Sequence, residues 1–486
     1  MLSVKTPVTR LSFSLPVMVL GTLISGLCWY VSCGLSGEYG WLLWIAPVPV
    51  LILSFQTSKG TTFLIAFTAY LIGRLSWFSY LESVATLIPA IIFTLLFPLA
   101  FACIILISRI IVLQIGSWYT LFAFPVFFTT FEFLFSISSP HGTAGSIAYS
   151  QMNMLPLIQI ASVTGMLGIT FFVTCVPSAI AVGWLYHKEK VQFRYILSFL
   201  TLLIISVLGF GEFRLISIPR TPKFKAGLVS LDEKYHYEPG RVEASKEIKA
   251  VENYVFHIAE LARQGAHMIV LPERAINIHT ETNAEILSLL QDAARQNQVG
   301  LVIGYTNLVQ KPETNAALII DVTGNLLNQY NKVHLIPGLE GQFMPGKNPA
   351  IVNFMSNQTG MAICKDLDFT RYIRKYGVAG ISVLFVPAWD FTVDDWLHSR
   401  MAILRSVENG FSQVRAARKG RLTINDAYGR VTSEANCADG QQALLIGSVS
   451  IVRIHTLYSR FGEWFGVLNV LAVIGFISIY MYRRKR

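Results

Sequence analysis

Long apolar runs separated by short polar loops dominate the first part of the chain. Most are near or above the roughly 20 residues that an α-helix needs to cross the hydrocarbon core of a bilayer. The run 41–56 is shorter and holds two prolines, and we expect Pro177 to kink or end a helix within the run 155–186. The pattern predicts about seven transmembrane helices within residues 1–217. The apolar runs are residues 11–33, 41–56, 61–81, 86–108, 116–137, 155–186 and 195–215.

The hydropathy pattern changes at Ile218, where apolar stretches shorten to strand length and charged residues become frequent. Because strand-like and helix-like segments alternate from here on, the pattern indicates an α/β domain over residues 224–453. The expected strands are Lys225–Leu231, His267–Leu271, Gly300–Tyr305, Ala316–Asp321, Met361–Cys364, Ile381–Pro387, Ser412–Ala416 and Ala443–Val449. The expected helices are Val242–Arg263, Asn283–Gln296 and Asp395–Glu408.

The last apolar run, Trp464–Tyr482, is followed by basic residues at positions 483–486. We interpret residues 454–486 as an eighth transmembrane helix with a basic cytoplasmic tail, and a packed helix with a solvated tail is the alternative. For the first run, 11–33, a cleaved signal peptide is the alternative to a transmembrane helix. The helix is favoured because further apolar runs follow closely.

Basic residues lie in alternate loops of this predicted bundle. Lys5 and Arg10 precede the first helix, Lys59 follows the second and Arg109 follows the fourth. Cytoplasmic loops carry an excess of lysine and arginine, so these loops and the N-terminus are expected in the cytoplasm. Seven crossings then place the chain from residue 218 onward on the opposite side of the membrane.

The composition agrees with a membrane protein. The chain is 53% hydrophobic and 14% charged, whereas a soluble globular protein has about 25% charged residues. Its net charge is +10, but the basic residues form no single cluster, so nucleic-acid binding is not indicated. The six cysteines include no CxxC pair, so neither a metal site nor a disulfide framework is predicted.

Three residues of the α/β region carry candidate chemistry. Cys364 ends an apolar stretch and is followed at once by polar residues, Glu273 follows Val270-Leu271-Pro272, and Lys332 lies in the stretch 330–337. A core cysteine, a helix-capping glutamate and a surface lysine are the alternatives for each residue taken alone. His334 is interpreted as structural because no metal-type partner is spaced near it.

Together these three residues predict nucleophilic catalysis on a carbonyl carbon. A thiolate attacks carbonyls far better than a thiol, so Cys364 needs a base and a nearby positive charge. Glu273 is expected to take the thiol proton and return it to the leaving group. Lys332 is expected to lower the thiol pKa and to stabilise the oxyanion, with the backbone N–H of Lys365 as a second oxyanion donor. The expected intermediate is an acyl-enzyme thioester, and no cofactor or metal is called for.

The Glu-Lys-Cys order resembles the nitrilase, or carbon–nitrogen hydrolase, superfamily. With the preceding membrane helices, the chain resembles the apolipoprotein N-acyltransferase family, which is a membrane-embedded branch of it. The resemblance implies an αββα sandwich joined to a multi-pass helical membrane domain. It also implies that Glu340 supports the lysine and that Trp389, Phe391 and Trp396 contact substrate. The membrane-domain motifs that carry it are Ala148-Tyr149-Ser150-Gln151, residues 156–161, residues 164–171 and Glu132.

The resemblance further implies a reaction and its partners. A fatty acyl chain would pass from a membrane phospholipid, through a thioester on Cys364, to the N-terminal amine of a diacylglyceryl-cysteine lipoprotein. A monomer of the bacterial inner membrane with a periplasmic catalytic domain is expected. Lys365 and Asp366 depart from the aromatic residue and glutamate usual in the family after its cysteine, and residues 139–142 replace its usual Phe-Pro-Trp run. The alternatives are a membrane-tethered amidase or nitrilase, an acyltransferase for a different amine, and a non-enzymatic scaffold.

Overall fold

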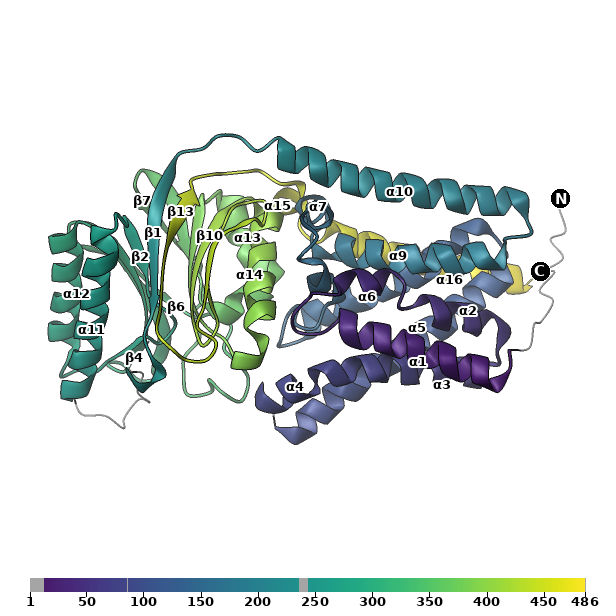
Figure 1. The fold of residues 1–486 in the computed structure, drawn as a ribbon, viewed down its shortest axis with the longest axis horizontal. Helices are drawn as coiled ribbons and strands as arrows, with labels where there is room; N and C mark the ends of the chain where they lie inside the picture. The colour runs from purple at the N-terminus through teal and green to yellow at the C-terminus, as the bar shows by residue number, and fades with distance from the viewer. Residues whose placement is uncertain (1–12, 85, 236–243, 486) are drawn as a thin grey trace. The chain divides into compact units, whose positions relative to one another are not determined.

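The computed structural model describes residues 13–84, 86–235 and 244–485. The predictions that rest on Lys5, Arg10, Val242 and Arg486 lie outside these residues. The chain divides into two compact units (Figure 1). The first unit is Met1–Ser139, Thr143–Ser217 and Glu463–Arg486, and the second is Pro140–Gly142 and Ile218–Gly462.

The first unit is a bundle of helices. Within the described residues, 7 helical segments are long and apolar enough to cross a membrane, judged by length and composition. They are Leu15–Ser32 (α1), Lys59–Val84 (α3 and α4), Leu87–Ile115 (α5), Trp118–Ser138 (with α6), Met166–Leu185 (α9), Lys190–Ile216 (α10) and Trp464–Lys485 (α16). Many of their apolar side chains point outward, as expected for helices that face lipid.

The second predicted crossing, 41–56, is not a regular spanning helix. It forms a 3-10 turn at Gly40–Trp44 and a short helix, α2, at Val48–Gln56. Pro47 is the N-cap of α2 and Pro49 lies in its first turn, where the missing N–H of proline removes no helical hydrogen bond, so both prolines favour a helix that starts here. The prediction that one continuous helix covers this run is therefore wrong.

The same segment nevertheless returns the chain along the bundle. Residues early in α1 contact residues late in α2, whereas contacts between α1 and α3 advance together along both helices. The close approaches are Gly21 with Leu53, Ser25 with Ala46, Gly26 with Ile72, and Trp29 with Gly73. Helices α1 and α3 thus run parallel and contact each other, and α2 runs antiparallel to both. The chain therefore passes along the bundle three times between residues 15 and 74.

The long run 155–186 is divided at Gly165 and not at Pro177. Short helices α7 (Leu155–Ile158) and α8 (Ala161–Thr164) precede Gly165, whose φ of 68° favours glycine. Helix α9 then continues through Pro177 to Leu185. Pro177 therefore does not end the helix, and the break in this run lies 12 residues earlier in the sequence.

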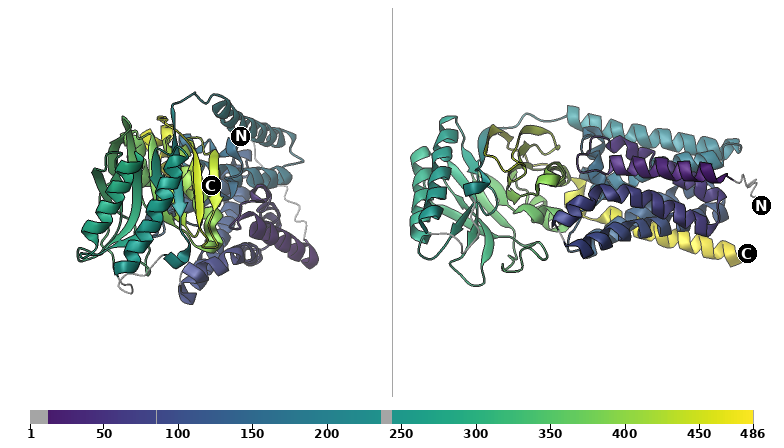
Figure 2. Two further views of the ribbon diagram at one scale, coloured as in Figure 1. Left: turned by 60° about the vertical axis from the view of Figure 1, so that its left-hand side comes forward. Right: turned by 60° about the horizontal axis from the view of Figure 1, so that its bottom comes forward.

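The second unit contains two β-sheets flanked by helices (Figures 1 and 2). One sheet has the strand order β13-β1-β2-β4-β5-β6, with β3 beside β4, and the other has the order β12-β11-β10-β9-β8-β7. The first contains β1 (Lys223–Ser230), β2 (Met268–Val270), β3 (Ile276–Ile278), β4 (Gly300–Asn307), β5 (Thr314–Ile320), β6 (Leu326–Asn331) and β13 (Ala443–Ser450). The second contains β7 (Ala350–Phe354), β8 (Asn357–Met361), β9 (Val383–Trp389), β10 (Ser412–Arg418), β11 (Arg421–Asn425) and β12 (Val431–Asn436).

Two apolar cores hold these layers together. One lies between the two sheets, and it includes Leu228 and Val270 from the first sheet and Phe385 and Val414 from the second. The other lies between the first sheet and helices α11 (Ala244–Arg263) and α12 (Asn283–Asn297). Helices α13 (Thr370–Ala379) and α14 (Asp395–Asn409) pack with the second sheet. The predicted αββα sandwich is confirmed.

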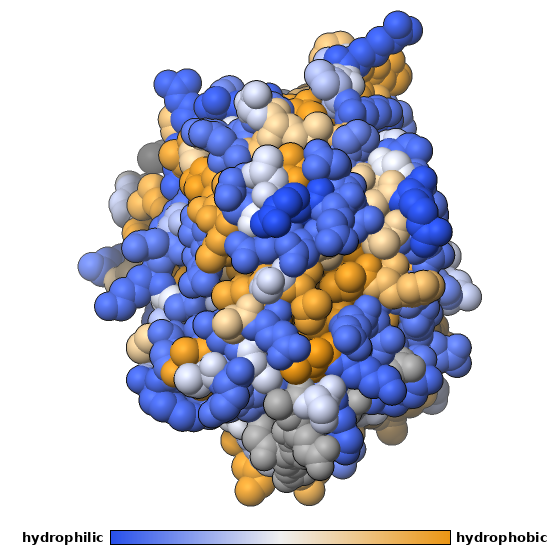
Figure 3. All heavy atoms as spheres, turned by 90° about the vertical axis from the view of Figure 1, so that its left-hand side faces the viewer, coloured by the Kyte–Doolittle hydropathy of each residue, from blue (hydrophilic) through white to orange (hydrophobic). Residues whose placement is uncertain are grey.

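The helices α11 and α12 are amphipathic, which explains their place as an outer layer. Tyr254, Ile258 and Leu261 of α11 and Leu290 of α12 are buried against the sheet. Hydrophilic side chains cover most of the outward face of this part of the unit (Figure 3). A helix with one apolar stripe is stable in such a position because it buries the stripe and leaves the polar face in water.

Candidate active site

Glu273 lies in the loop after β2, where the carboxyl end of a parallel strand meets the inter-sheet region. The residue is 2% exposed, and its backbone N–H donates to the carbonyl of Ala388 over 3.1 Å. Gly304 of β4 makes this position possible, since a Cβ there would lie 2.2 Å from the carbonyl oxygen of Pro272. The glycine thus lets the Glu273 loop pass close to β4.

Lys332 follows β6 and is fully buried between two carboxylates. Its Nζ lies 2.7 Å from Glu273 Oε1 and 2.9 Å and 3.1 Å from the two oxygens of Glu340. Burial acts against the charged form, but Glu273 and Glu340 outweigh it and raise the pKa of Lys332. The ammonium is therefore kept charged, as a buried cation requires. We singled out Glu273, Lys332 and Glu340 from separate stretches of the sequence, and the structure brings their side chains together.

Asn315 completes this network, and sequence reasoning missed it. Its Nδ2 donates to Glu273 Oε1 and to Glu340 Oε1, each over 2.6 Å. The backbone N–H of Ile336 donates to the other oxygen of Glu340 over 2.7 Å. Asn315 lies in the strand Thr314–Ile320, whose residues are all buried, and the expected strand began one residue after it. A polar side chain in such a strand needs a partner, because an unsatisfied buried amide is costly.

Cys364 begins a 3-10 turn, Cys364–Asp368, after β8. The expected strand Met361–Cys364 therefore ends at Met361, before the nucleophile. The φ of Cys364 is 40°, a value in a region that residues other than glycine seldom adopt and that often marks functional positions. The partly exposed thiol donates to the carbonyl oxygen of Trp389 over 3.4 Å.

The pKa of the Cys364 thiol is raised well above its ordinary value. Burial is the main cause and Glu273 adds to it, while Lys332 acts in the opposite direction. Lys332 thus lowers the pKa as we expected, but its effect does not prevail in the resting protein, where the thiol is neutral. The side chain of Lys365 lies 3.6 Å from Asp368 and 3.5 Å from His141 Nδ1. Asp390 also raises the pKa of the thiol, and Arg415 lowers it.

Asp366 fixes the nucleophile turn to the segment that carries Lys332. The carboxylate is completely buried and accepts hydrogen bonds from the backbone N–H of Ile363 over 3.0 Å and of His334 over 2.8 Å. It also accepts from the Tyr330 hydroxyl over 2.6 Å. The His334 ring lies 2.9 Å from the same carboxylate and stacks on Phe369, a structural arrangement of the kind we expected for His334.

A second buried ion pair acts on the Cys364 thiol, and sequence reasoning also missed it. Arg415 of β10 pairs with Asp390, which follows Trp389, and the Nη1–Oδ2 distance is 2.9 Å. Burial raises the pKa of Asp390, and Arg415 opposes this effect. The pair anchors the end of β9. The last residue of this strand, Trp389, supplies the carbonyl oxygen that accepts the hydrogen bond of the Cys364 thiol.

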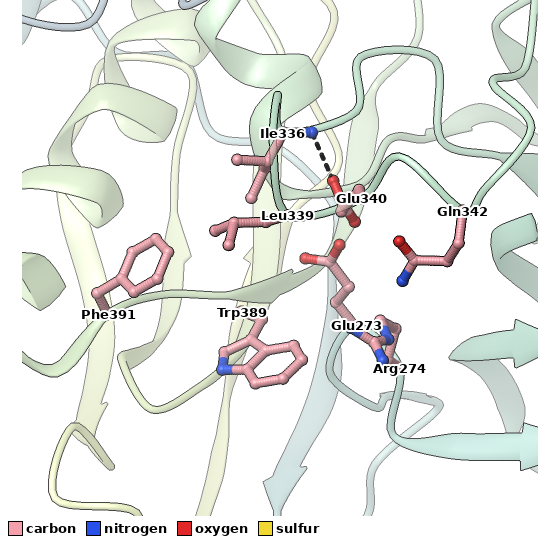
Figure 4. A pocket seen from close by; sticks show the side chains of 8 residues that line it. All are labelled: Glu273, Arg274, Ile336, Leu339, Glu340, Gln342, Trp389 and Phe391. Atoms are coloured by element: carbon pink, nitrogen blue, oxygen red, sulfur yellow. Dashed lines mark hydrogen bonds between the residues drawn. The ribbon is translucent and has the colours of Figure 1, made fainter. Parts of the chain in front are cut away.

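A pocket of about 270 Å³ opens over the two carboxylates (Figure 4). Trp389 and Phe391, which the family resemblance suggested as substrate contacts, both line it. Trp396 does not. It is 9% exposed at the start of α14, with the Arg400 guanidinium 5.6 Å from its ring centre. The remaining lining residues are Glu273, Arg274, Ile336, Leu339, Glu340 and Gln342.

This arrangement suits covalent catalysis at a carbonyl. It joins a thiol, a carboxylate and a buried ammonium beside a pocket with an apolar wall. Among residues 13–84, 86–235 and 244–485, no group of three or more histidine, cysteine or acidic side chains is placed to hold a metal ion.

Comparisons with known proteins cover both units. A family profile for the apolipoprotein N-acyltransferase N-terminal domain matches residues 25–179, and one for carbon-nitrogen hydrolase matches residues 242–454. An apolipoprotein N-acyltransferase of Geobacter metallireducens is 24% identical over 91% of this chain and 91% of its own length. One from Treponema denticola is 23% identical over 95% of each chain. A solved amidase from Nesterenkonia has 19% identity and a TM-score of 0.44, covering 51% of this chain and 97% of its own.

Proposed function

Because the chain belongs to the apolipoprotein N-acyltransferase family, we propose that it transfers a fatty acyl chain from a phospholipid to the N-terminal amine of a diacylglyceryl-cysteine lipoprotein. One observation carries the proposal. Lys332 is buried between Glu273 and Glu340, and it acts electrostatically on the Cys364 thiol, in a chain that also has helices long enough to span a membrane.

In the first half-reaction, Cys364 attacks the ester carbonyl carbon of the phospholipid. Glu273 takes the thiol proton as the C–S bond forms, and Lys332 and the backbone N–H of Lys365 stabilise the oxyanion. When the tetrahedral intermediate collapses, the ester C–O bond breaks and Glu273 gives the proton to the departing lysophospholipid oxygen. The acyl chain remains on Cys364 as a thioester.

In the second half-reaction, the neutral α-amine of the lipoprotein attacks the thioester carbon. The C–N bond forms, Glu273 receives a proton from the amine nitrogen, and the C–S bond breaks. The proton then returns to the sulfur, so the enzyme regains its neutral thiol. Trp389 and Phe391 help to exclude water from the thioester until the amine arrives, because hydrolysis would waste it. Trp396 remains a predicted substrate contact outside the pocket lining.

We propose that the protein acts as a monomer in the bacterial inner membrane with its catalytic domain in the periplasm. All the proposed catalytic groups come from one chain, and nucleic acid has no role. The passage made by residues 40–56 supports seven crossings before residue 218. Lys59 at the start of α3 and Arg109 near the end of α5 support a cytoplasmic N-terminus. Reporter fusions at residue 220 and at the C-terminus test this topology. A cytoplasmic signal at residue 220 would overturn it.

Mass spectrometry of the protein after incubation with labelled phospholipid tests the reaction. We expect one acyl group on Cys364, its transfer to a diacylglyceryl lipopeptide with a free α-amine, and ping-pong kinetics. Cys364→Ala should form no acyl-enzyme while remaining folded. Label released only as free fatty acid, or hydrolysis of soluble amides without acylation of Cys364, would instead identify a hydrolase.

A further inference from the structure

Arg274 is a cationic residue of the pocket that the reaction described above does not use. It directly follows Glu273 and has a φ of 51°, so a long side chain is held in a backbone region that normally suits glycine. Such strain is retained where the position of the side chain matters. The guanidinium lies over two aromatic rings, 5.1 Å from the centre of Trp389 and 5.3 Å from that of Phe343.

The pocket has an apolar and a polar side with the carboxylates between them (Figure 4). Ile336, Leu339 and Phe391 lie on the left in this view, and Gln342 and Arg274 lie on the right. An ester whose carbonyl lies at the central groups would therefore have its acyl chain against the apolar residues. Its alcohol part, which leaves in the first half-reaction, would lie toward Arg274 and Gln342.

The charges of the pocket explain why binding a phosphodiester anion would need the positive charge of Arg274. Glu273 and Glu340 contribute two negative charges when ionised, and Lys332 contributes one positive charge, so these groups alone leave one net negative charge. A phosphodiester anion would be repelled by that charge in a poorly solvated pocket. Arg274, whose Nε donates to Thr306 Oγ1 over 3.4 Å, adds a positive charge that offsets it. The planar N–H donors of a guanidinium match the oxygens of a phosphate.

We propose that Arg274, with Gln342 beside it, binds the phosphodiester of the phospholipid donor and so selects an acyl donor that carries a phosphodiester over an ester that lacks one. The inference rests on the proposed function and adds the group that recognises its first substrate. It assigns the polar side of the pocket to the head group and the apolar side to the acyl chain.

The test compares two donors in each protein. Acyl-enzyme formation is measured by intact mass spectrometry with phosphatidylethanolamine and with an uncharged p-nitrophenyl ester of the same fatty acid. The readout is the ratio of the two rates, which does not depend on the fraction of protein that is folded. Because hydrogen bonds to a charged group are lost, Arg274→Gln should lower this ratio by about tenfold or more. Arg274→Lys should recover part of the loss.

Arg418→Gln is the matched control. Arg418 also lies over Trp389, at 3.9 Å from the ring centre, but it is held by Glu233 over 2.6 Å and 2.8 Å and does not line the pocket. Its substitution should leave the donor ratio near the wild-type value. An unchanged ratio in Arg274→Gln, or an equal fall in Arg418→Gln, would overturn the inference. Wild-type protein that accepts neither donor would instead count against the proposed function.

Discussion

Glu273→Gln is expected to abolish acyl transfer and yet make the Cys364 thiol more reactive toward alkylation at neutral pH. Transfer is lost because the amide accepts no proton. The gain in reactivity follows from the resting charges: after burial, Glu273 is the largest influence that raises the pKa of Cys364, and Lys332 opposes it. Removing the Glu273 charge also leaves the Lys332 ammonium paired only with Glu340.

The size of the effect can be worked from these charges. Removal of a neighbouring carboxylate lowers a pKa by about 1–3 units, and well below the pKa each unit gives about ten times more thiolate. A thiolate of lower pKa is also a weaker nucleophile, and this cancels about half of the gain on a logarithmic scale. The rate of alkylation at pH 7 should therefore rise by about 3- to 30-fold.

The assay follows adduct formation with uncharged iodoacetamide by intact mass and by peptide mapping of Cys364. Glu340→Gln is the matched control, because Glu340 pairs with the same lysine, whereas Glu273 is the carboxylate with the largest effect on the pKa of Cys364. The Glu340→Gln substitution should change the rate of alkylation less than Glu273→Gln does.

In the wild type the rate of alkylation should rise steadily as pH increases from 7 to beyond 9, since a thiol of raised pKa is protonated at neutral pH. Slower alkylation in Glu273→Gln would refute this reasoning, because it would mean that Glu273 already generates thiolate at rest.

Two further predictions concern the frame of the site. Asp366→Asn replaces an acceptor oxygen by a donor in a fully buried cluster, which should cost about 2 kcal/mol and lower the Tm of the catalytic domain in detergent by about 4–8 °C; an unchanged Tm would contradict the role of Asp366. His398 lies 2.5 Å from Asp394, and although burial acts against its charged form, Asp394 raises the pKa of His398 to about 9. The stability from this pair is complete below the unfolded pKa of about 6.5 and is lost as pH rises through about 9, so His398→Gln should flatten the fall of Tm over this pH range.

Glu273 and Cys364 could be singled out because each follows a short apolar segment, and Lys332 was singled out by its place between them in the Glu-Lys-Cys order. Asn315 could not, because its role depends on strand pairing. The backbone N–H of Lys332 donates to the Asn315 carbonyl over 2.9 Å where β5 pairs with β6. Strand β6, Leu326–Asn331, shows no alternation of apolar and polar residues, because Leu326 and Leu327 are both exposed and only Tyr330 is buried, so its hydropathy gave no strand signal. Without β6, the neighbour of Lys332 was not accessible to sequence reasoning.

Long-range charge pairs escaped prediction for a related reason. Asp390 and Arg415 lie 25 residues apart and meet because β9 and β10 are adjacent parallel strands. In the membrane unit, the prolines of the run 41–56 correctly marked it as unusual. Only the contacts of α1 with α2 and α3 show that the run still returns the chain along the bundle. Periodicity identifies elements, whereas their register decides which side chains meet.

The resting charges of the site also bear on how an acyltransferase avoids wasting its donor. Lys332 is bound by two carboxylates, and the Cys364 thiol is neutral, so the nucleophile is not formed in advance. Negative charge on the substrate carbonyl in the transition state would give the ammonium a further partner at the moment when the thiol loses its proton to Glu273. Activation is then coupled to the presence of an ester in the pocket. The same coupling applies to the second half-reaction, in which an amine, and not water, must reach the thioester while Glu273 is free to accept a proton.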